Sequence, residues 1–191
     1  MLLFFALLSC LFAISFASNP TLGGGWSWDT ANALGLAAFA GMLYLVMTPR
    51  GARDLKKHEW FSYVTIGLVA FHAFWMLLSD GAVIEYVKPS APWYMWTGIA
   101  GLLLLYATLQ TSIMPTRLKL YKSYRAFSGW HRGIAILAVL LTAHHIIISG
   151  FYFEKIYQIG ALLLLLAWVC FSRELRVSPN QQTAASPVHL I

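Results

Sequence analysis

Histidines are the residues of this sequence whose type and spacing best suit chemistry. Ionisable side chains at membrane depth are costly, which makes them functional candidates. A single membrane histidine can equally be a hydrogen-bonding group between helices, so the hypothesis depends on the joint pattern. His189 lies in a polar tail and is interpreted as solvated. The other five lie in two apolar stretches: His58 and His72 in the first, and His131, His144 and His145 in the second.

The spacing of these histidines predicts two binding sites at different depths. His58 and His72 are 14 residues apart, and His131 lies 13 residues before His144 and 14 before His145. On an α-helix such separations correspond to roughly 20 Å. If both stretches run in the same direction, one imidazole from each can meet the two faces of a haem. The pattern therefore predicts two stacked b-type haems with bis-histidine ligation.

Two alternatives concern the metal and the outer ligand. Zinc requires three or four ligands clustered at about 2 Å from one ion, and two pairs of histidines separated by half a bilayer do not supply such a set. At about 100° per residue, 14 steps return to within about 40° of the start, whereas 13 steps miss by about 140°. A straight helix thus favours His145 as the partner of His131, while curvature, a π-bulge or approach from different sides would admit His144. The residues alone leave both open.

The composition predicts an all-α integral membrane protein. Of 191 residues, 59% are hydrophobic and 10% are charged, whereas soluble domains carry about 25% charged residues. So little charge excludes a disordered chain, a nucleic-acid partner and a soluble enzyme. A spanning helix needs about 20 mostly apolar residues. Six runs, separated by Pro and Gly, are predicted to span the lipid bilayer: Met1–Ala17, Thr30–Met47, Glu59–Ser79, Pro92–Thr111, Ser128–Phe151 and Tyr157–Phe171.

The first run also has the length of a signal peptide. Ser15-Phe16-Ala17 would serve as a cleavage site, but no Lys or Arg precedes the run. We therefore favour a retained first helix, and five spanning helices if it is cleaved. The predicted organisation is residues 1–17 as this helix or signal peptide, 30–172 as a haem-binding helical domain, and 177–191 as a disordered tail.

Basic residues predict the orientation in the membrane. In a six-helix topology, 11 of the 13 Lys and Arg residues fall on one side, and the positive-inside rule assigns that side, with both termini, to the cytoplasm. Arg125 and Arg132 are near the inner histidines in sequence and are predicted to bind haem propionates, since Arg suits carboxylates. Lys57 and Lys122 are further candidates. All four are equally explained as determinants of topology.

Two segments carry a resemblance to a known family. They are His58-Glu59-Trp60 to Phe71-His72, and Trp130-His131-Arg132-Gly133 to Thr142-Ala143-His144. Over about Leu43 to Trp168 the sequence resembles the ferric-reductase transmembrane family. That family includes NADPH oxidases, yeast-type ferric reductases and the haem subunit of a bacterial periplasmic methionine sulfoxide reductase. The family's spacings of 14 and 13 imply His58 with His131 at the inner haem and His72 with His144 at the outer haem, with His145 in reserve.

The resemblance implies an electron-transfer subunit of an oxidoreductase in a bacterial cell membrane. No Gly-rich nucleotide fingerprint is present, so the expected cytoplasmic-side donor is a separate flavoprotein or a quinol. The expected acceptor is extracytoplasmic, such as a redox partner. One alternative is a quinol-linked cytochrome b subunit of a respiratory complex, although its Pro-Glu-Trp-Tyr motif is absent. Another is a redox-inert membrane scaffold whose histidines only join helices.

Overall fold

The described residues of this computed structural model form long helices. They are residues 1–18, 25–48, 55–79, 87–113, 119–121 and 123–174, with side chains described up to residue 170. Within these ranges there are six long helices and no β-strand, which confirms the all-α prediction. The helices are α1 (Leu2–Ser18), α2 (Gly25–Met47), α3 (Leu55–Ser79), α4 (Trp93–Ser112), α6 (Tyr124–Ser149) and α7 (Ile156–Glu174).

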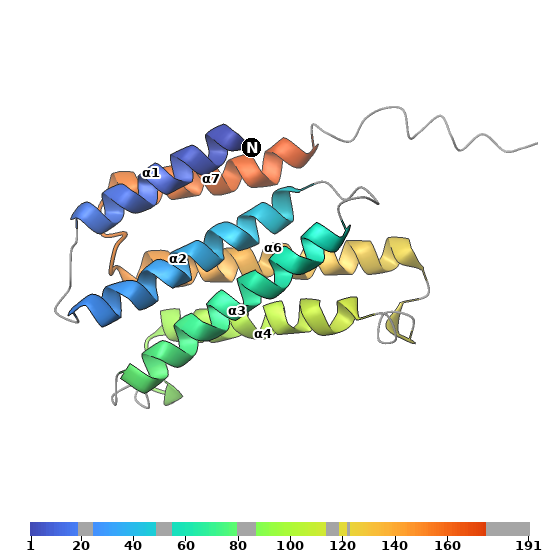
Figure 1. Ribbon diagram of the computed structural model, residues 1–191, viewed down its shortest axis with the longest axis horizontal. Helices are drawn as coiled ribbons and strands as arrows, with labels where there is room; N and C mark the ends of the chain where they lie inside the picture. Colours follow the sequence, from blue (N-terminus) through green and yellow to red (C-terminus); the bar gives the residue numbers. More distant parts are fainter. Residues whose placement is uncertain (19–24, 49–54, 80–86, 114–118, 122, 175–191) are drawn as a thin grey trace, which may run out of the picture.

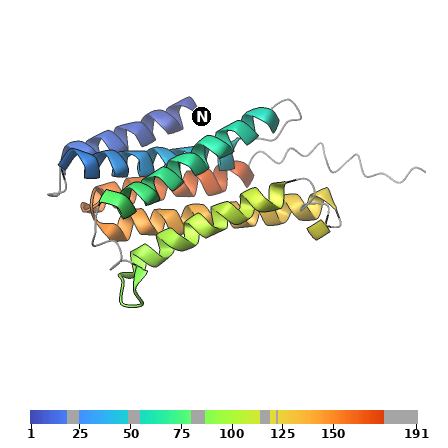
Figure 2. The same ribbon diagram turned by 60° about the horizontal axis from the view of Figure 1, so that its bottom comes forward.

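Consecutive helices run in opposite directions along the bundle (Figures 1 and 2). The most extensive contacts join α2 to α3 and α4 to α6, which gives two antiparallel hairpins. Helix α2 also packs on α6, and α1 and α7 lie together beside this pair. The helices α3 and α6, which carry the five candidate histidines, therefore run in the same direction, as the spacing argument required.

Several helices begin outside the predicted apolar runs. Helix α2 begins at Gly25 rather than Thr30, and α3 begins at Leu55 rather than Glu59, because polar residues can extend a helix beyond its apolar part. The start of α6 is capped by Ser123, whose hydroxyl accepts a 3.2 Å hydrogen bond from the N–H of Ala126. Helix α6 ends before Gly150, which adopts a left-handed conformation with φ of 68°.

The core lies where α1, α2, α6 and α7 meet. Phe4 of α1, Phe39 of α2 and Leu162 of α7 are fully buried there, together with Phe153 from the loop before α7. Close van der Waals packing of such side chains is a main attraction between helices in a membrane. Helix α1 is thus packed into the core through one face.

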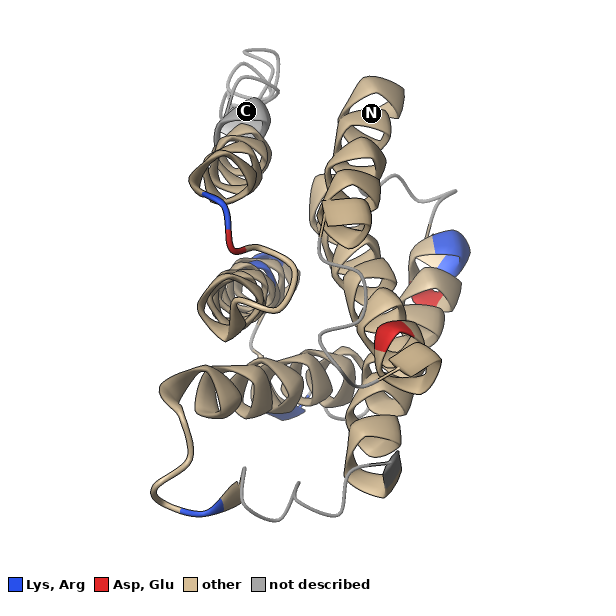
Figure 3. Cartoon of the chain, turned by 90° about the vertical axis from the view of Figure 1, so that its left-hand side faces the viewer, with Lys and Arg blue, Asp and Glu red and all other residues tan. Residues whose placement is uncertain are grey.

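Among the described residues, three helices are long and apolar enough to cross a membrane: Gly25–Met47, Leu55–Leu78 and Tyr124–Ser149. Few residues of Leu55–Leu78 are buried, and Leu78 and Trp93 at helix ends are exposed, which suits contact with lipid. Figure 3 shows helices almost devoid of charged residues. These features indicate a membrane protein. The predicted tail at 177–191 and Lys122 lie outside the described residues.

Candidate functional site

His72 of α3 is held by the neighbouring helix α2. Its Nδ1 lies 2.7 Å from the carbonyl oxygen of Ala31. A carbonyl can only accept a hydrogen bond, so Nδ1 carries the proton and donates it. In the neutral imidazole this leaves the lone pair on Nε2, which is the form of histidine that binds a metal. The hydrogen bond to a backbone carbonyl also fixes the ring's orientation, as is usual for metal-binding histidines.

His145 of α6 is held in the same way by α4. Its Nδ1 lies 2.7 Å from the carbonyl oxygen of Tyr94, which again assigns the proton to Nδ1 and the lone pair to Nε2. The Tyr94 ring lies beside the imidazole, with centroids 5.9 Å apart. The two hairpins thus present one histidine each through equivalent contacts, although the sequence shows no obvious repeat.

A glycine lies under each of these imidazoles. A Cβ at Gly35 would lie 2.9 Å from Nδ1 of His72, and a Cβ at Gly98 would lie 2.8 Å from Nδ1 of His145. Each glycine follows the accepting carbonyl, that of Ala31 or Tyr94, by four residues and so lies one helical turn further along the same face. Each imidazole therefore lies across one turn of the adjacent helix.

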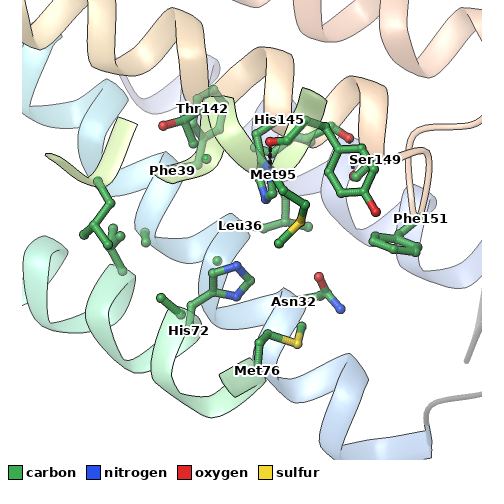
Figure 4. Close-up of a pocket in the computed structure, with 18 of the residues that line it drawn as sticks. Asn32, Leu36, Phe39, His72, Met76, Met95, Thr142, His145, Ser149 and Phe151 are labelled. Atoms are coloured by element: carbon green, nitrogen blue, oxygen red, sulfur yellow. Dashed lines mark hydrogen bonds between the residues drawn. The ribbon is translucent and has the colours of Figure 1, made fainter. Parts of the chain in front are cut away.

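His72 and His145 line one apolar cavity of about 280 Å³, which we name the outer cavity after the predicted outer pair. Figure 4 shows the two rings reaching into it from different helices, with Leu36 and Met95 nearby. The walls are mostly aliphatic, aromatic and methionine side chains, and polar groups are few. Such a cavity suits an apolar ligand that is oriented by a few polar contacts.

His144 lies outside this lining. Its side chain is exposed, and its Nδ1 is 3.2 Å from the hydroxyl of Thr97. That hydroxyl donates to the carbonyl of Tyr94 at 2.9 Å, so it accepts from His144. The structure therefore brings His145, rather than the family-implied His144, together with His72.

His58 and His131 line a second cavity of about 720 Å³, which we name the inner cavity after the predicted inner pair. Nδ1 of His131 lies 3.2 Å from the hydroxyl of Ser112. Because that hydroxyl donates to the carbonyl of Thr108 at 2.6 Å, it accepts from His131, and the lone pair of His131 again lies on Nε2. Arg132 also lines this cavity. The two histidines predicted to form the inner pair, His58 and His131, therefore line the same cavity.

The predicted propionate-binding residues separate into two groups. Arg132 borders the inner cavity, whereas Arg125 lines a separate groove beside Gly129 and Gly133. Lys57 is exposed and lines neither cavity. Of the predicted cations in the described ranges, Arg132 is the one that lines a cavity together with histidines.

Sequence reasoning missed the glycine and carbonyl partners of the histidines. Gly35 and Gly98 were not predicted to contact them, because glycine is common in membrane helices for general packing. The Ala31 and Tyr94 carbonyls carry no signal at all, since every residue has one. Only the pairing of helices reveals them.

A polar contact lies beside the outer cavity, at the start of α2. Tyr152, in the loop after α6, donates a 2.5 Å hydrogen bond to Oδ1 of Asp29. Burial raises the pKa of the Tyr152 phenol, and the hydrogen bond to Asp29 raises it further. Tyr152 and Asn32 both line the cavity, so its lining includes a neutral phenol beside an acidic group.

The described residues hold no group of three or more His, Cys, Asp and Glu able to bind a metal ion together. A haem iron requires only two axial protein ligands. The donor set at each cavity is two imidazoles, which matches that requirement.

Comparisons with known proteins place the chain in no family. No family model matches it, and no solved structure does so either. Over 107 residues, 50% of this chain, it is 25% identical to an uncharacterized protein of Archaeoglobus fulgidus. The match covers 56% of that relative, so the chain spans little more than half the length of the curated protein it matches.

Proposed function

We propose that this protein is a b-type dihaem membrane cytochrome that carries electrons from a cytoplasmic-side donor to an extracytoplasmic acceptor. The observation that carries the proposal is the pair of cavities, each lined by one histidine from α3 and one from α6. The inner cavity has His58 and His131. The outer cavity has His72 and His145.

The chemistry of these side chains supports haem as the cofactor. In His72, His131 and His145 the hydrogen bond of Nδ1 leaves the lone pair on Nε2, which is the form of histidine that ligates a metal. The walls of the outer cavity are apolar, which suits a porphyrin and excludes water. Haem held by these histidines would supply one-electron transfer.

The protein's own residues would orient the cofactors and keep them close. The carbonyls of Ala31 and Tyr94 hold the outer imidazoles in one orientation. Arg132 can offer a bidentate partner to a carboxylate at the inner cavity. The linings of the two cavities share Met42 and Leu105, so the two sites adjoin through a short apolar contact.

The proposed topology has six spanning helices and both termini in the cytoplasm of a bacterial cell. The described basic residues Lys56, Lys57 and Arg125 lie near the starts of α3 and α6. These helix starts lie at the same end of the bundle (Figure 1), which supports a cytoplasmic assignment for the end with the inner cavity. The ferric-reductase resemblance adds a separate flavoprotein or quinol as the donor.

An absorbance spectrum of the purified full chain tests the proposal. We expect a Soret band, and a pyridine-haemochrome assay should count two haems per chain. Reduction by a purified cytoplasmic flavoprotein would support a flavoprotein donor. Loss of haem reduction in quinone-depleted membranes would instead favour the quinol-linked cytochrome. Absence of a Soret band would contradict both.

A redox-inert scaffold is a second candidate that one observation favours. The 2.7 Å hydrogen bonds of His72 to α2 and of His145 to α4 join helices without any cofactor. In that case the purified protein carries no haem, and a lower thermal stability is the only effect of replacing either histidine. The spectrum of the unmodified protein separates the two functions.

A further inference from the structure

We infer that His145, and not His144, is the partner of His72 in the outer pair, and that Gly35 and Gly98 are positioning residues for these two imidazoles. The inference rests on the proposed haem-binding function. It departs from the 13-residue spacing of the family that the sequence resembles, and it assigns a role to two glycines on helices that carry no histidine.

The regularity of α6 selects His145. The helix is α-helical without interruption from Tyr124 to Ser149, with no π-bulge. On such a helix the 14 residues from His131 to His145 return to within about 40° of one face, and the 13 residues to His144 miss it by about 140°. His58 and His72 on α3 are also 14 residues apart. The same spacing on both helices therefore presents each pair toward the same interior.

The surroundings of the two adjacent histidines agree with this choice. His145 lines the outer cavity together with His72, whereas His144 is exposed and hydrogen-bonds Thr97. To replace His145 in the cavity, His144 would require α6 to turn by about 100°. Such a turn would also break the hydrogen bond between His145 and the Tyr94 carbonyl.

The glycines act by leaving room where each ring is fixed. A Cβ at Gly35 or Gly98 would lie less than 3.0 Å from its imidazole, closer than real Cβ atoms approach a neighbour. The ring cannot move away freely, because its Nδ1 is bonded to the carbonyl one turn earlier on that same helix. Alanine at either position would therefore tilt the imidazole and change the direction of Nε2.

Single replacements of the adjacent histidines test the ligand assignment. In full-length protein purified in detergent, we expect His145→Ala to halve the haem count, from two per chain to one, and His144→Ala to keep two. Elution volume in size exclusion reports folding, and the remaining inner haem serves as an internal control. If His144→Ala loses a haem and His145→Ala keeps both, the assignment is overturned. Equal haem counts in the two variants would overturn it as well.

The same measurements separate this inference from the proposed function. Unmodified protein without a Soret band contradicts haem binding itself. If the unmodified protein carries two haems and one of them is lost in His144→Ala, only the choice of ligand is contradicted. His145→Gln, which keeps a polar side chain of similar length, distinguishes loss of ligation from collapse of the fold: it should lose the same haem and retain the normal elution volume.

Glycine replacements test positioning with a readout that packing alone would not move. We expect Gly35→Ala and Gly98→Ala each to shift or remove the low-spin electron paramagnetic resonance signal of one haem, because that signal depends on imidazole orientation. Gly133→Ala on α6 is the matched control, since a Cβ there meets nothing within 4 Å. Spectra of Gly35→Ala and Gly98→Ala identical to that of the unmodified protein would overturn the positioning role.

Discussion

The phenol of Tyr152 donates a hydrogen bond of 2.5 Å to Oδ1 of Asp29, which lies 123 residues earlier in the chain. Tyr152 is 4% exposed, and the ring of Phe16 stacks on it with centroids 4.3 Å apart. One side chain thus joins α1, the start of α2 and the loop after α6. Because Tyr152 also lines the outer cavity, this contact links the stability of the fold to the candidate site.

Removing the phenol should therefore destabilise the protein. We expect Tyr152→Phe to lower the free energy of unfolding by about 1.5–3 kcal/mol, the usual contribution of a hydrogen bond to a charged group. Thermal denaturation in detergent measures the change. Tyr157→Phe is the control, because that side chain is largely exposed. An equal loss of stability in both variants would contradict a special role for the contact with Asp29.

The same phenol predicts a loss of stability at alkaline pH. Burial raises the pKa of Tyr152 above its ordinary value of 10, so the folded state favours the protonated phenol. Its contribution is fully present below pH 10 and declines as the pH rises above that value, because the unfolded chain then releases the proton more readily. The difference in stability between the unmodified protein and Tyr152→Phe should shrink above pH 10. A difference that is constant up to pH 11 would contradict this linkage.

A tight contact between Gly41 and Thr65 should fix the packing of α2 on α3. A Cβ at Gly41 would lie 2.5 Å from Oγ1 of Thr65, and Thr65 is buried. We expect Gly41→Ala to cost about 1–3 kcal/mol through overpacking. Combining it with Thr65→Ala should recover most of that loss, since the clashing hydroxyl and methyl are removed. Additive losses in the double variant, measured by thermal denaturation, would contradict the contact.

Much of the fold could be predicted from the sequence, because apolar length and Pro or Gly breaks locate helices directly. All six predicted runs correspond to helices, and the errors lie at the ends. Polar residues such as Lys56 extend α3 beyond its apolar part, a region that a search for apolar runs omits. Helix α6 ends at Ser149 because Gly150 adopts a left-handed conformation. Gly150 lies inside a predicted apolar run, so the sequence did not reveal this conformation.

The candidate site was predictable only in part, because spacing along one helix does not identify the neighbouring helix. The histidines of α3 and α6 were found from their spacing. The pairing of α2 with α3 and of α4 with α6 is long-range information, and it determines that Gly35 and Gly98 lie under the imidazoles. Arg125 and Arg132 looked equivalent in sequence and lie two turns apart on α6, yet only Arg132 lines the cavity of His58 and His131, whereas Arg125 lines a separate groove.

The packing of α1 predicts different effects for adjacent side chains. Phe4 is fully buried and its ring lies edge-on to Trp168 of α7 at 5.8 Å, whereas Leu3 is 63% exposed. We expect Phe4→Ala to cost about 3–5 kcal/mol and Leu3→Ala to change stability by less than about 0.5 kcal/mol. Thermal denaturation of the full chain measures both. Similar small effects would show that α1 does not pack in this way.

The inner histidines should control one haem independently of the other. Because the two cavities share only Met42 and Leu105 in their linings, His58→Ala or His131→Ala should reduce the count from two haems per chain to one. The remaining haem should keep its absorbance and resonance spectra. Simultaneous loss of both haems, in protein with a normal elution volume, would contradict two separate sites.

The two arginines of α6 give a final prediction about reduction potential. Arg132 borders the inner cavity and Arg125 faces a groove elsewhere. A nearby positive charge favours the reduced state of a haem, so Arg132→Gln should lower the midpoint potential of the inner haem. An exposed charge contributes about 0.2–1 kcal/mol, which corresponds to a shift of roughly 10–40 mV for one electron. Arg125→Gln has the same change in charge and should shift the potential by less. A redox titration compares the two, and an equal shift would mean that proximity to the cavity has no influence.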